Sequence, residues 1–241
     1  MKKLVVGNWK LNPTSATEAV NLARASDLSG VVVCPPDIFL IEVGRVLENA
    51  SLGAQDIFYE DGAAVTGEVS AAELKKIGVT YVIVGHSSRR EMVGETDKLI
   101  NLKVKAALSA NLKTILCVGE SLNLHQKGES SSRAFVLGQL KENLMGIEGG
   151  GEDLIVAYEP IWSISTSGTN LVETPEGAAS MIGYIKEELD KLGFRGVSVL
   201  YGGSVDGDGA KDFLALEVVG GVLVGRASLD VDEFNKIIAL A

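Results

Sequence analysis

The sequence contains very few of the residues that build disulfide networks and metal sites. Of its 241 residues, only two are cysteines and two are histidines. Cys34 and Cys117 lie in separate apolar runs and neither belongs to a Cys-x-x-Cys pair, which excludes a disulfide framework and favours a reducing compartment. His86 and His125 are too few for a histidine-rich metal centre, so we expect no metal.

Long apolar runs and an excess of positive charge are also missing. No stretch approaches the roughly 18 apolar residues of a membrane span, and the N-terminal apolar stretch is interrupted at Asn8, too early for a secretion signal. The chain has 22 Lys and Arg against 32 Asp and Glu, a net charge of −10. Binding to a phosphate backbone usually needs a basic face. We therefore expect a cytoplasmic protein that binds neither membrane nor nucleic acid.

The apolar residues, 46% of the chain, gather in eight short runs rich in β-branched side chains. The runs are mostly continuous rather than alternating, which is typical of strands buried on both faces, as in a parallel sheet. They cover residues 4–7, 31–34, 51–55, 81–85, 114–118, 154–158, 197–202 and 222–225.

Segments with helical spacing of apolar residues separate most of these runs. One starts at residue 16, and others cover residues 99–108, 137–144, 178–189 and 231–240. This alternation fits either a closed eight-fold β/α barrel or an open doubly wound sheet. The glycine-rich nucleotide motifs of the open sheet are absent after the first strand. We favour the barrel, as a single domain over residues 1–241.

Polar residues follow several of the predicted strands, at the end where a β/α barrel carries its functional site. Lys10 follows the first strand, His86 the fourth and Glu159 the sixth. Glycine-containing turns at residues 202–204 and 225–226 follow the last two strands, and their backbone N–H groups could bind an anion. One cation, one imidazole and one carboxylate are thus predicted to meet at the same rim.

At this level of detail the chain resembles the triosephosphate isomerase family from end to end. The matching motifs are GNWKLN at 7–12, AQD at 54–56, TGE at 66–68, GHS at 85–87, CVGE at 117–120, AYEPIW at 157–162, YGGSV at 201–205 and LVG-ASL around residue 225. The resemblance implies a TIM barrel. It also implies the cofactor-independent interconversion of dihydroxyacetone phosphate and glyceraldehyde 3-phosphate through an enediolate, in glycolysis and gluconeogenesis.

The resemblance also implies a role for each site residue. Glu159 matches the base and His86 matches the neutral electrophile. This family is a standard example of a glutamate base paired with a neutral histidine. Lys10 matches the cation that stabilises the enediolate and the phosphate. The implied substrate contacts are Asn8, Lys10 and the backbone N–H groups of Ser165, Ser204, Gly225 and Arg226. The implied supporting residues are Ser87, Ser88, Thr66 and the apolar pair Ile164 and Leu223, which would close over the base.

Three features depart from the family pattern. Ser88 stands where the family nearly always has a glutamate, so we expect a reduced but real activity. Ser165 and Ser167 replace two glycines of the lid, which spans residues 160–169. Arg226 replaces a glycine of the last phosphate-binding turn, and we expect its side chain to point away while its N–H still donates.

The resemblance further implies a homodimer, with a higher oligomer possible. Residues 56–70, which include Thr66, match the loop that enters the neighbouring subunit beside Asn8 and His86, so the isolated monomer should be nearly inactive. Two alternatives stay open: a non-catalytic barrel that binds phosphosugars, and an isomerase of another small phosphosugar. His125 is expected to have no catalytic role.

Overall fold

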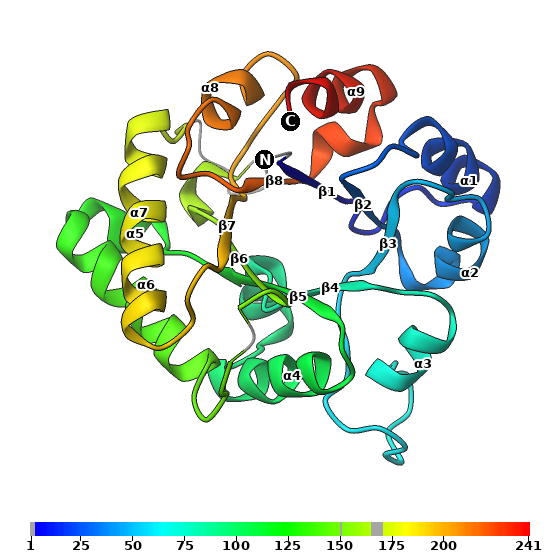
Figure 1. Ribbon diagram of the computed structural model, residues 1–241, viewed down its shortest axis with the longest axis horizontal. Helices are drawn as coiled ribbons and strands as arrows, with labels where there is room; N and C mark the ends of the chain where they lie inside the picture. Colours follow the sequence, from blue (N-terminus) through cyan, green and yellow to red (C-terminus); the bar gives the residue numbers. More distant parts are fainter. Residues whose placement is uncertain (1–2, 150, 165–170) are drawn as a thin grey trace.

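The computed structural model describes residues 3–149, 151–164 and 171–241 and contains a closed barrel of eight parallel strands surrounded by helices (Figure 1). Each strand pairs with its neighbours in chain order. The strands are β1 (Leu4–Asn8), β2 (Val31–Cys34), β3 (Ser51–Ala54), β4 (Tyr81–Val84), β5 (Lys113–Val118), β6 (Leu154–Tyr158), β7 (Ser198–Tyr201) and β8 (Gly221–Val224).

The last strand pairs with the first and closes the sheet. Leu4 lies opposite Gly221, and Val5 lies opposite Val222. This pairing confirms the predicted barrel and excludes the open doubly wound sheet. Every strand lies within one residue, at either end, of its predicted range, because continuous apolar runs mark strands that are buried on both faces.

Among the described residues, helices occupy the connections between strands. They are α1 (Ala16–Ala25), α2 (Leu40–Gly44), α3 (Ala71–Lys76), α4 (Asp97–Ser109), α5 (Leu122–Gln126), α6 (Glu129–Asn143), α7 (Pro175–Lys191), α8 (Ala210–Leu214) and α9 (Val231–Leu240), with short helical turns η1 (Asp37–Phe39), η2 (Arg89–Val93), η3 (Ile161–Ser163) and η4 (Arg226–Leu229).

The longer helices correspond to the predicted periodic segments, with two differences. The helix predicted at 137–144 begins eight residues earlier, at Glu129, because its first turns are polar and carry no apolar period. The short helices α2, α3, α5 and α8 were not among the predicted segments. The signal of α3 is a capping box, in which the Ser70 hydroxyl accepts from the Glu73 N–H and the Glu73 carboxylate accepts from the Ser70 N–H.

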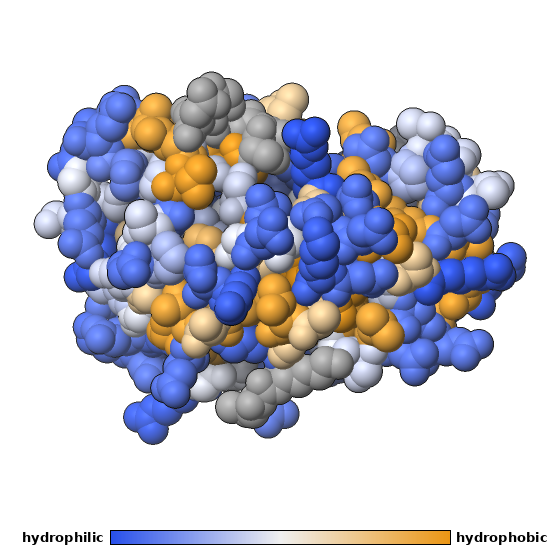
Figure 2. Space-filling model, turned by 90° about the horizontal axis from the view of Figure 1, so that it is seen from above, coloured by the Kyte–Doolittle hydropathy of each residue, from blue (hydrophilic) through white to orange (hydrophobic). Residues whose placement is uncertain are grey.

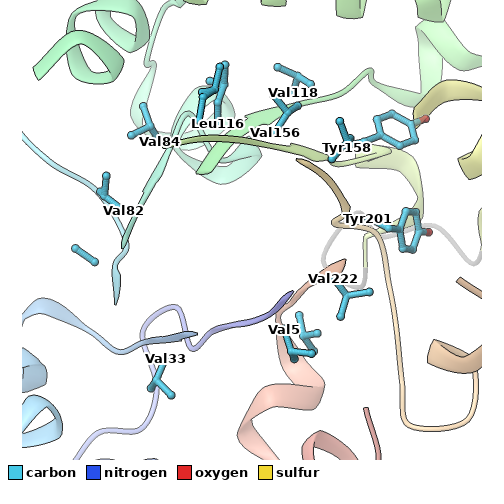
Figure 3. Packing of buried hydrophobic residues seen from close by; sticks show 14 of the residues in the cluster. Val5, Val33, Val82, Val84, Leu116, Val118, Val156, Tyr158, Tyr201 and Val222 are labelled. Atoms are coloured by element: carbon cyan, nitrogen blue, oxygen red, sulfur yellow. The ribbon is translucent and has the colours of Figure 1, made fainter. Parts of the chain in front are cut away.

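The core has two layers on either side of the barrel wall. Alternate strand residues such as Val5, Val84 and Val156 point outward and pack against the helices (Figure 3). The residues between them fill the barrel interior: Val6, Val32, Cys34, Ile83, Ile115, Cys117, Ile155, Ala157, Leu200 and Leu223. The barrel is therefore a packed scaffold, and the loops at the C-terminal ends of its strands are left to form a site.

Polar and hydrophobic residues are interspersed on the side of the molecule seen in Figure 2. No helix in the described part of the chain is both long enough and apolar enough to span a membrane.

Candidate active site

A cavity of about 560 Å³ opens at the C-terminal ends of the strands. The structure brings most of the predicted site residues to this cavity. Its lining includes Asn8, Lys10, His86, Glu159, Ile164, Ser204, Leu223, Gly225 and Arg226. Ser87 and Ser88 contact the lining residues, whereas Thr66 is exposed on the loop after β3 and Ser165 lies outside the described residues.

Glu159 follows β6 and is buried, with 2% of its surface exposed. One carboxylate oxygen, Oε2, accepts a hydrogen bond from the Ser87 N–H at 3.0 Å. The other, Oε1, lies 3.1 Å from Nε2 of His86. The predicted base and the predicted electrophile are thus in direct contact, although they come from different strands.

Two glycines make room for this glutamate. A Cβ atom at Gly119, after β5, would lie 1.8 Å from the Glu159 carbonyl oxygen, and one at Gly202, after β7, would lie 2.9 Å from Glu159 Cγ. The backbone of Glu159 is also bound on one side, because its N–H donates to the Val118 carbonyl at 2.8 Å. These approaches explain physically why CVGE and YGG carry glycine beside the base.

His86 follows β4, and its surroundings define its protonation. The Ser88 N–H donates to His86 Nδ1 at 3.2 Å, so Nδ1 carries a lone pair and the ring hydrogen is on Nε2. Burial lowers the pKa of His86; the negative charge of Glu159 opposes this effect, and the positive charges of Lys10 and Arg89 add to it. The neutral imidazole therefore presents an N–H donor to the cavity.

Lys10 has a left-handed backbone, with φ at +53°, which is uncommon for a bulky residue. Its N–H donates to the Asn8 side-chain oxygen at 3.1 Å, and its carbonyl accepts from the Gln55 side chain at 2.8 Å. A Cβ atom at Gly225 would lie 3.9 Å from Lys10 Nζ. The ammonium group therefore lies beside the turn after β8, which is one of the predicted phosphate-binding turns.

The turns after β7 and β8 complete the cavity wall. The Ser204 N–H donates to the Ser163 carbonyl at 3.2 Å, so this predicted phosphate donor already has a protein partner. Gly225 leads into η4, where both the N–H and the hydroxyl of Ser228 donate to the Gly225 carbonyl. Arg226 lines the cavity and makes no ion pair with any residue in the described ranges.

With this geometry in place, the chain can be compared with known proteins. The family model described as triosephosphate isomerase matches residues 3–241. The chain belongs to the triosephosphate isomerase family. Relatives named triosephosphate isomerase occur in Caldanaerobacter subterraneus subsp. tengcongensis, at 42% identity, and Carboxydothermus hydrogenoformans, also at 42%, each covering 98% of both chains. A protein of the same name from Aquifex aeolicus is 37% identical over 99% of both chains.

Two triosephosphate isomerase family motifs meet at a contact that sequence reasoning missed. Tyr158 and Trp162 both donate to Glu120 Oε1, the indole Nε1 at 2.8 Å and the phenol at 3.2 Å. Burial raises the pKa of Glu120. The ring of His125 stacks on Trp162 with centroids 3.8 Å apart and does not line the cavity. The motifs contain Glu120, Tyr158 and Trp162, but the spacing of these residues in the sequence does not show that they are in contact.

Neither cysteine lines the active-site cavity of this member of the triosephosphate isomerase family. Cys34 and Cys117 are fully buried in the barrel interior, and burial raises the pKa of both thiols. Within the part of the chain that the structure describes, no three His, Cys, Asp or Glu side chains form a group that could hold a metal ion.

Proposed function

We propose that this chain catalyses the interconversion of dihydroxyacetone phosphate and glyceraldehyde 3-phosphate, without a cofactor, as one barrel domain that acts in the cytoplasm in glycolysis and gluconeogenesis. The observation that carries the proposal is the convergence of Glu159, His86 and Lys10 on one cavity in a chain of this family. A barrel that merely binds phosphosugars has no need of a buried carboxylate in contact with a neutral imidazole.

Glu159 acts as the base. Its carboxylate lies out of water, where proton abstraction from carbon is not opposed by a hydration shell. It removes the proton from the carbon next to the carbonyl, and the electron pair of that bond moves into the enediolate. The hydroxyl proton moves from one substrate oxygen to the other, and returning the abstracted proton to the neighbouring carbon completes the isomerisation and restores the carboxylate.

His86 stabilises the charge that develops on the substrate oxygens. Its Nε2–H faces the Glu159 carboxylate, 3.1 Å away. A bound substrate oxygen would accept this N–H in place of Glu159, which frees the carboxylate to approach the carbon. A neutral donor suits this role because it stabilises an oxyanion without having to surrender a full charge.

The phosphate is bound by Lys10, with Asn8 as a neighbouring polar contact, and by the N–H groups of Ser204, Gly225 and Arg226. The Ser204 N–H must exchange the Ser163 carbonyl for a phosphate oxygen, which couples phosphate binding to the start of the loop after β6. The Ser165 N–H is the fourth proposed donor. Ile164 and Leu223 line the same cavity as Glu159 and supply the apolar cover.

The active form is a homodimer that pairs through residues 56–70. The supporting observation is a set of exposed apolar side chains that follow β1, β2 and β4: Leu11 (86% exposed), Ile38 (76%) and Met92 (85%). Thr66 is exposed on the loop after β3, which projects from the barrel in Figure 1. Gathered on one rim, these residues are typical of a surface that a second protein covers.

The decisive experiment is a coupled assay with dihydroxyacetone phosphate. We expect isomerase activity in the unmodified chain and a loss of kcat of about 10²- to 10⁴-fold in Glu159→Gln, since the amide cannot act as a base. Glu159→Asp retains the carboxylate at a greater distance from the substrate, so its kcat should lie between those of the unmodified chain and Glu159→Gln. Binding of the substrate without turnover would favour the non-catalytic barrel, and turnover of only another phosphosugar would favour the second alternative.

A further inference from the structure

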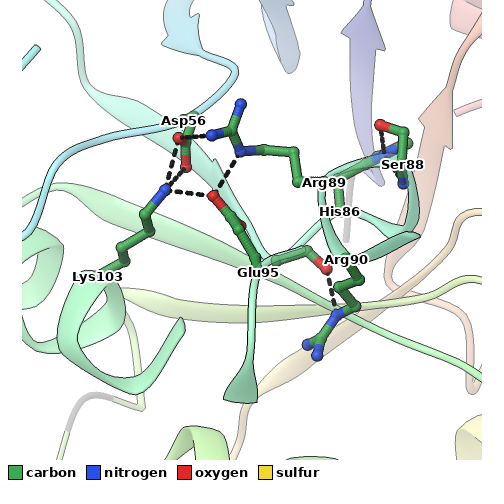
Figure 4. Close-up of polar contacts among 8 residues, drawn as sticks. Asp56, His86, Ser88, Arg89, Arg90, Glu95 and Lys103 are labelled. Atoms are coloured by element: carbon green, nitrogen blue, oxygen red, sulfur yellow. Dashed lines mark hydrogen bonds and ion pairs between the residues drawn. The ribbon is translucent and has the colours of Figure 1, made fainter. Parts of the chain in front are cut away.

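Ser88 makes two contacts with the catalytic imidazole. Its backbone N–H donates to His86 Nδ1 at 3.2 Å, and its hydroxyl oxygen lies 2.9 Å from the same nitrogen (Figure 4). An N–H group can only donate, so Nδ1 is an acceptor. A hydroxyl facing an acceptor lone pair at 2.9 Å completes the contact by donating its own hydrogen.

We propose that the Ser88 hydroxyl is a positioning residue for the isomerisation: as a second donor to Nδ1, it holds His86 in the neutral form with the hydrogen on Nε2. This inference rests on the proposed function and assigns a role to a side chain that differs from the family pattern. A proton on Nδ1 would face the Ser88 N–H, which cannot accept it. Both the other neutral tautomer and the imidazolium would therefore give up that bond and require the hydroxyl to turn and accept instead of donate.

The surroundings of Ser88 keep the hydroxyl in place. The next residue, Arg89, points the other way and binds Glu95 at 2.7 Å and Asp56 at 2.7 Å (Figure 4). Arg90 donates to the Gly85 carbonyl at 2.6 Å. These bonds fix the backbone of the turn that contains Ser88. Its short side chain is therefore held beside the His86 ring.

The glutamate usual at this position of the family cannot supply this contact, since an ionised carboxylate only accepts hydrogen bonds. Sequence reasoning therefore treats Ser88 as the loss of a charge. The structure gives it a contact of its own, on the side of the imidazole that faces away from Glu159.

The chain has only two histidines, which makes the test direct. Imidazole ¹⁵N NMR on histidine-labelled protein reports the tautomer and the pH titration of each ring, and His125→Gln assigns the two sets of signals. We expect Ser88→Ala to shift the His86 titration to higher pH and to lower kcat about 3- to 10-fold, the worth of one hydrogen bond, with KM little changed. Ser88→Thr, which keeps the hydroxyl, should restore both.

A matched control is Ser132→Ala, because Ser132 is a buried serine whose hydroxyl has no partner among the described residues. It should leave kcat and both histidine spectra unchanged. The proposal is overturned if Ser88→Ala keeps the wild-type His86 spectrum, if kcat is unchanged despite a changed spectrum, or if Ser88→Thr behaves like Ser88→Ala. The spectrum needs no turnover, so failure of the proposed function would show separately, as an unmodified chain that does not isomerise.

Discussion

At the scale of single residues, the proposed site includes a residue whose backbone conformation is unfavourable. Lys10 is that residue: a left-handed backbone costs a side-chain-bearing residue roughly 1–2 kcal/mol. Asn8 and Gln55 bind its peptide groups on both sides and stabilise that conformation. Strain of this kind is typical of functional positions, where the geometry of a charge matters more than local stability.

Replacing Lys10 should therefore separate stability from activity. Lys10→Gly removes both the charge and the strain, while Lys10→Met removes the charge and keeps the strain. We expect both variants to lose about 10²-fold or more in kcat/KM, and Lys10→Gly to be more stable than Lys10→Met by about 1 kcal/mol in urea unfolding. Equal stabilities would show that the left-handed backbone carries no strain.

At the scale of elements, a buried ion cluster ties three segments together. Lys103 on α4 is 2% exposed and binds both Asp56, after β3, and Glu95, after η2 (Figure 4). Arg89 at the start of η2 binds the same two carboxylates. The cluster therefore fixes the position of the first residue of the predicted dimer loop (residues 56–70) relative to the turn that carries Ser88.

Removing the cation at the centre of this cluster should be costly. Lys103→Met leaves two buried carboxylates with less compensation, for which we expect a loss of about 3–5 kcal/mol in the free energy of unfolding. Lys98→Met on the same helix is the control, because Lys98 is exposed and should change stability by less than about 0.5 kcal/mol. Similar losses in the two variants would contradict a specific role for the cluster.

The same cluster predicts an unusual dependence of stability on pH. Burial raises the pKa of Asp56 to about 6, against the attraction of Lys103 and Arg89, while an unfolded aspartate titrates near about 3.9. Between these values the folded state binds a proton that the unfolded state does not. The contribution of Asp56 to stability therefore grows as the pH falls from about 7 towards 4 and is lost as the pH rises through about 6.

Asp56→Asn removes this titration. Measured at one protein concentration, the free energy of unfolding of the wild type relative to Asp56→Asn should increase between pH 7 and pH 5. A difference that stays constant, or that decreases on acidification, would show that Asp56 does not take up a proton in this range.

At the scale of the whole molecule, the two halves of the rim differ. The loops after β1, β2 and β4 carry the exposed apolar residues Leu11, Ile38 and Met92, whereas the turns after β7 and β8 line the cavity. Lys10 and His86 lie on the loops after β1 and β4, the same loops that carry Leu11 and Met92. Under the proposed homodimer, covering that face would therefore also support the catalytic residues.

Disrupting this face should reduce association and activity together. We expect Met92→Lys to shift the protein towards monomer in analytical ultracentrifugation and to make its specific activity fall on dilution, because a charge would have to be buried against the partner. Met145→Lys, at a position 64% exposed beyond α6, is the matched control and should leave both properties unchanged. Full activity in a monomeric Met92→Lys protein would contradict the dimer proposal.

Most of the fold was predictable because it follows from local patterns. Short apolar runs, most of them rich in β-branched residues, marked all eight strands, and helical periodicity marked the longer helices, since both depend on residues close together in the chain. Glu159, His86 and Lys10 could be named in advance because each lies one or two residues after a strand and belongs to a family motif. Helix α3 was missed because a single capping box, at Ser70, carries its signal.

The sequence by itself determined which residues reach the rim of the barrel, and only the tertiary structure decided what each one touches there. The register of β8 against β1, the contact of Glu120 with Trp162 and the two contacts of Ser88 with the His86 imidazole depend on side-chain direction and on how the loops pack at the strand ends. A linear pattern records the order and polarity of residues. It does not record the distances between strands that are far apart in the chain, and the proposed catalysis depends on those distances.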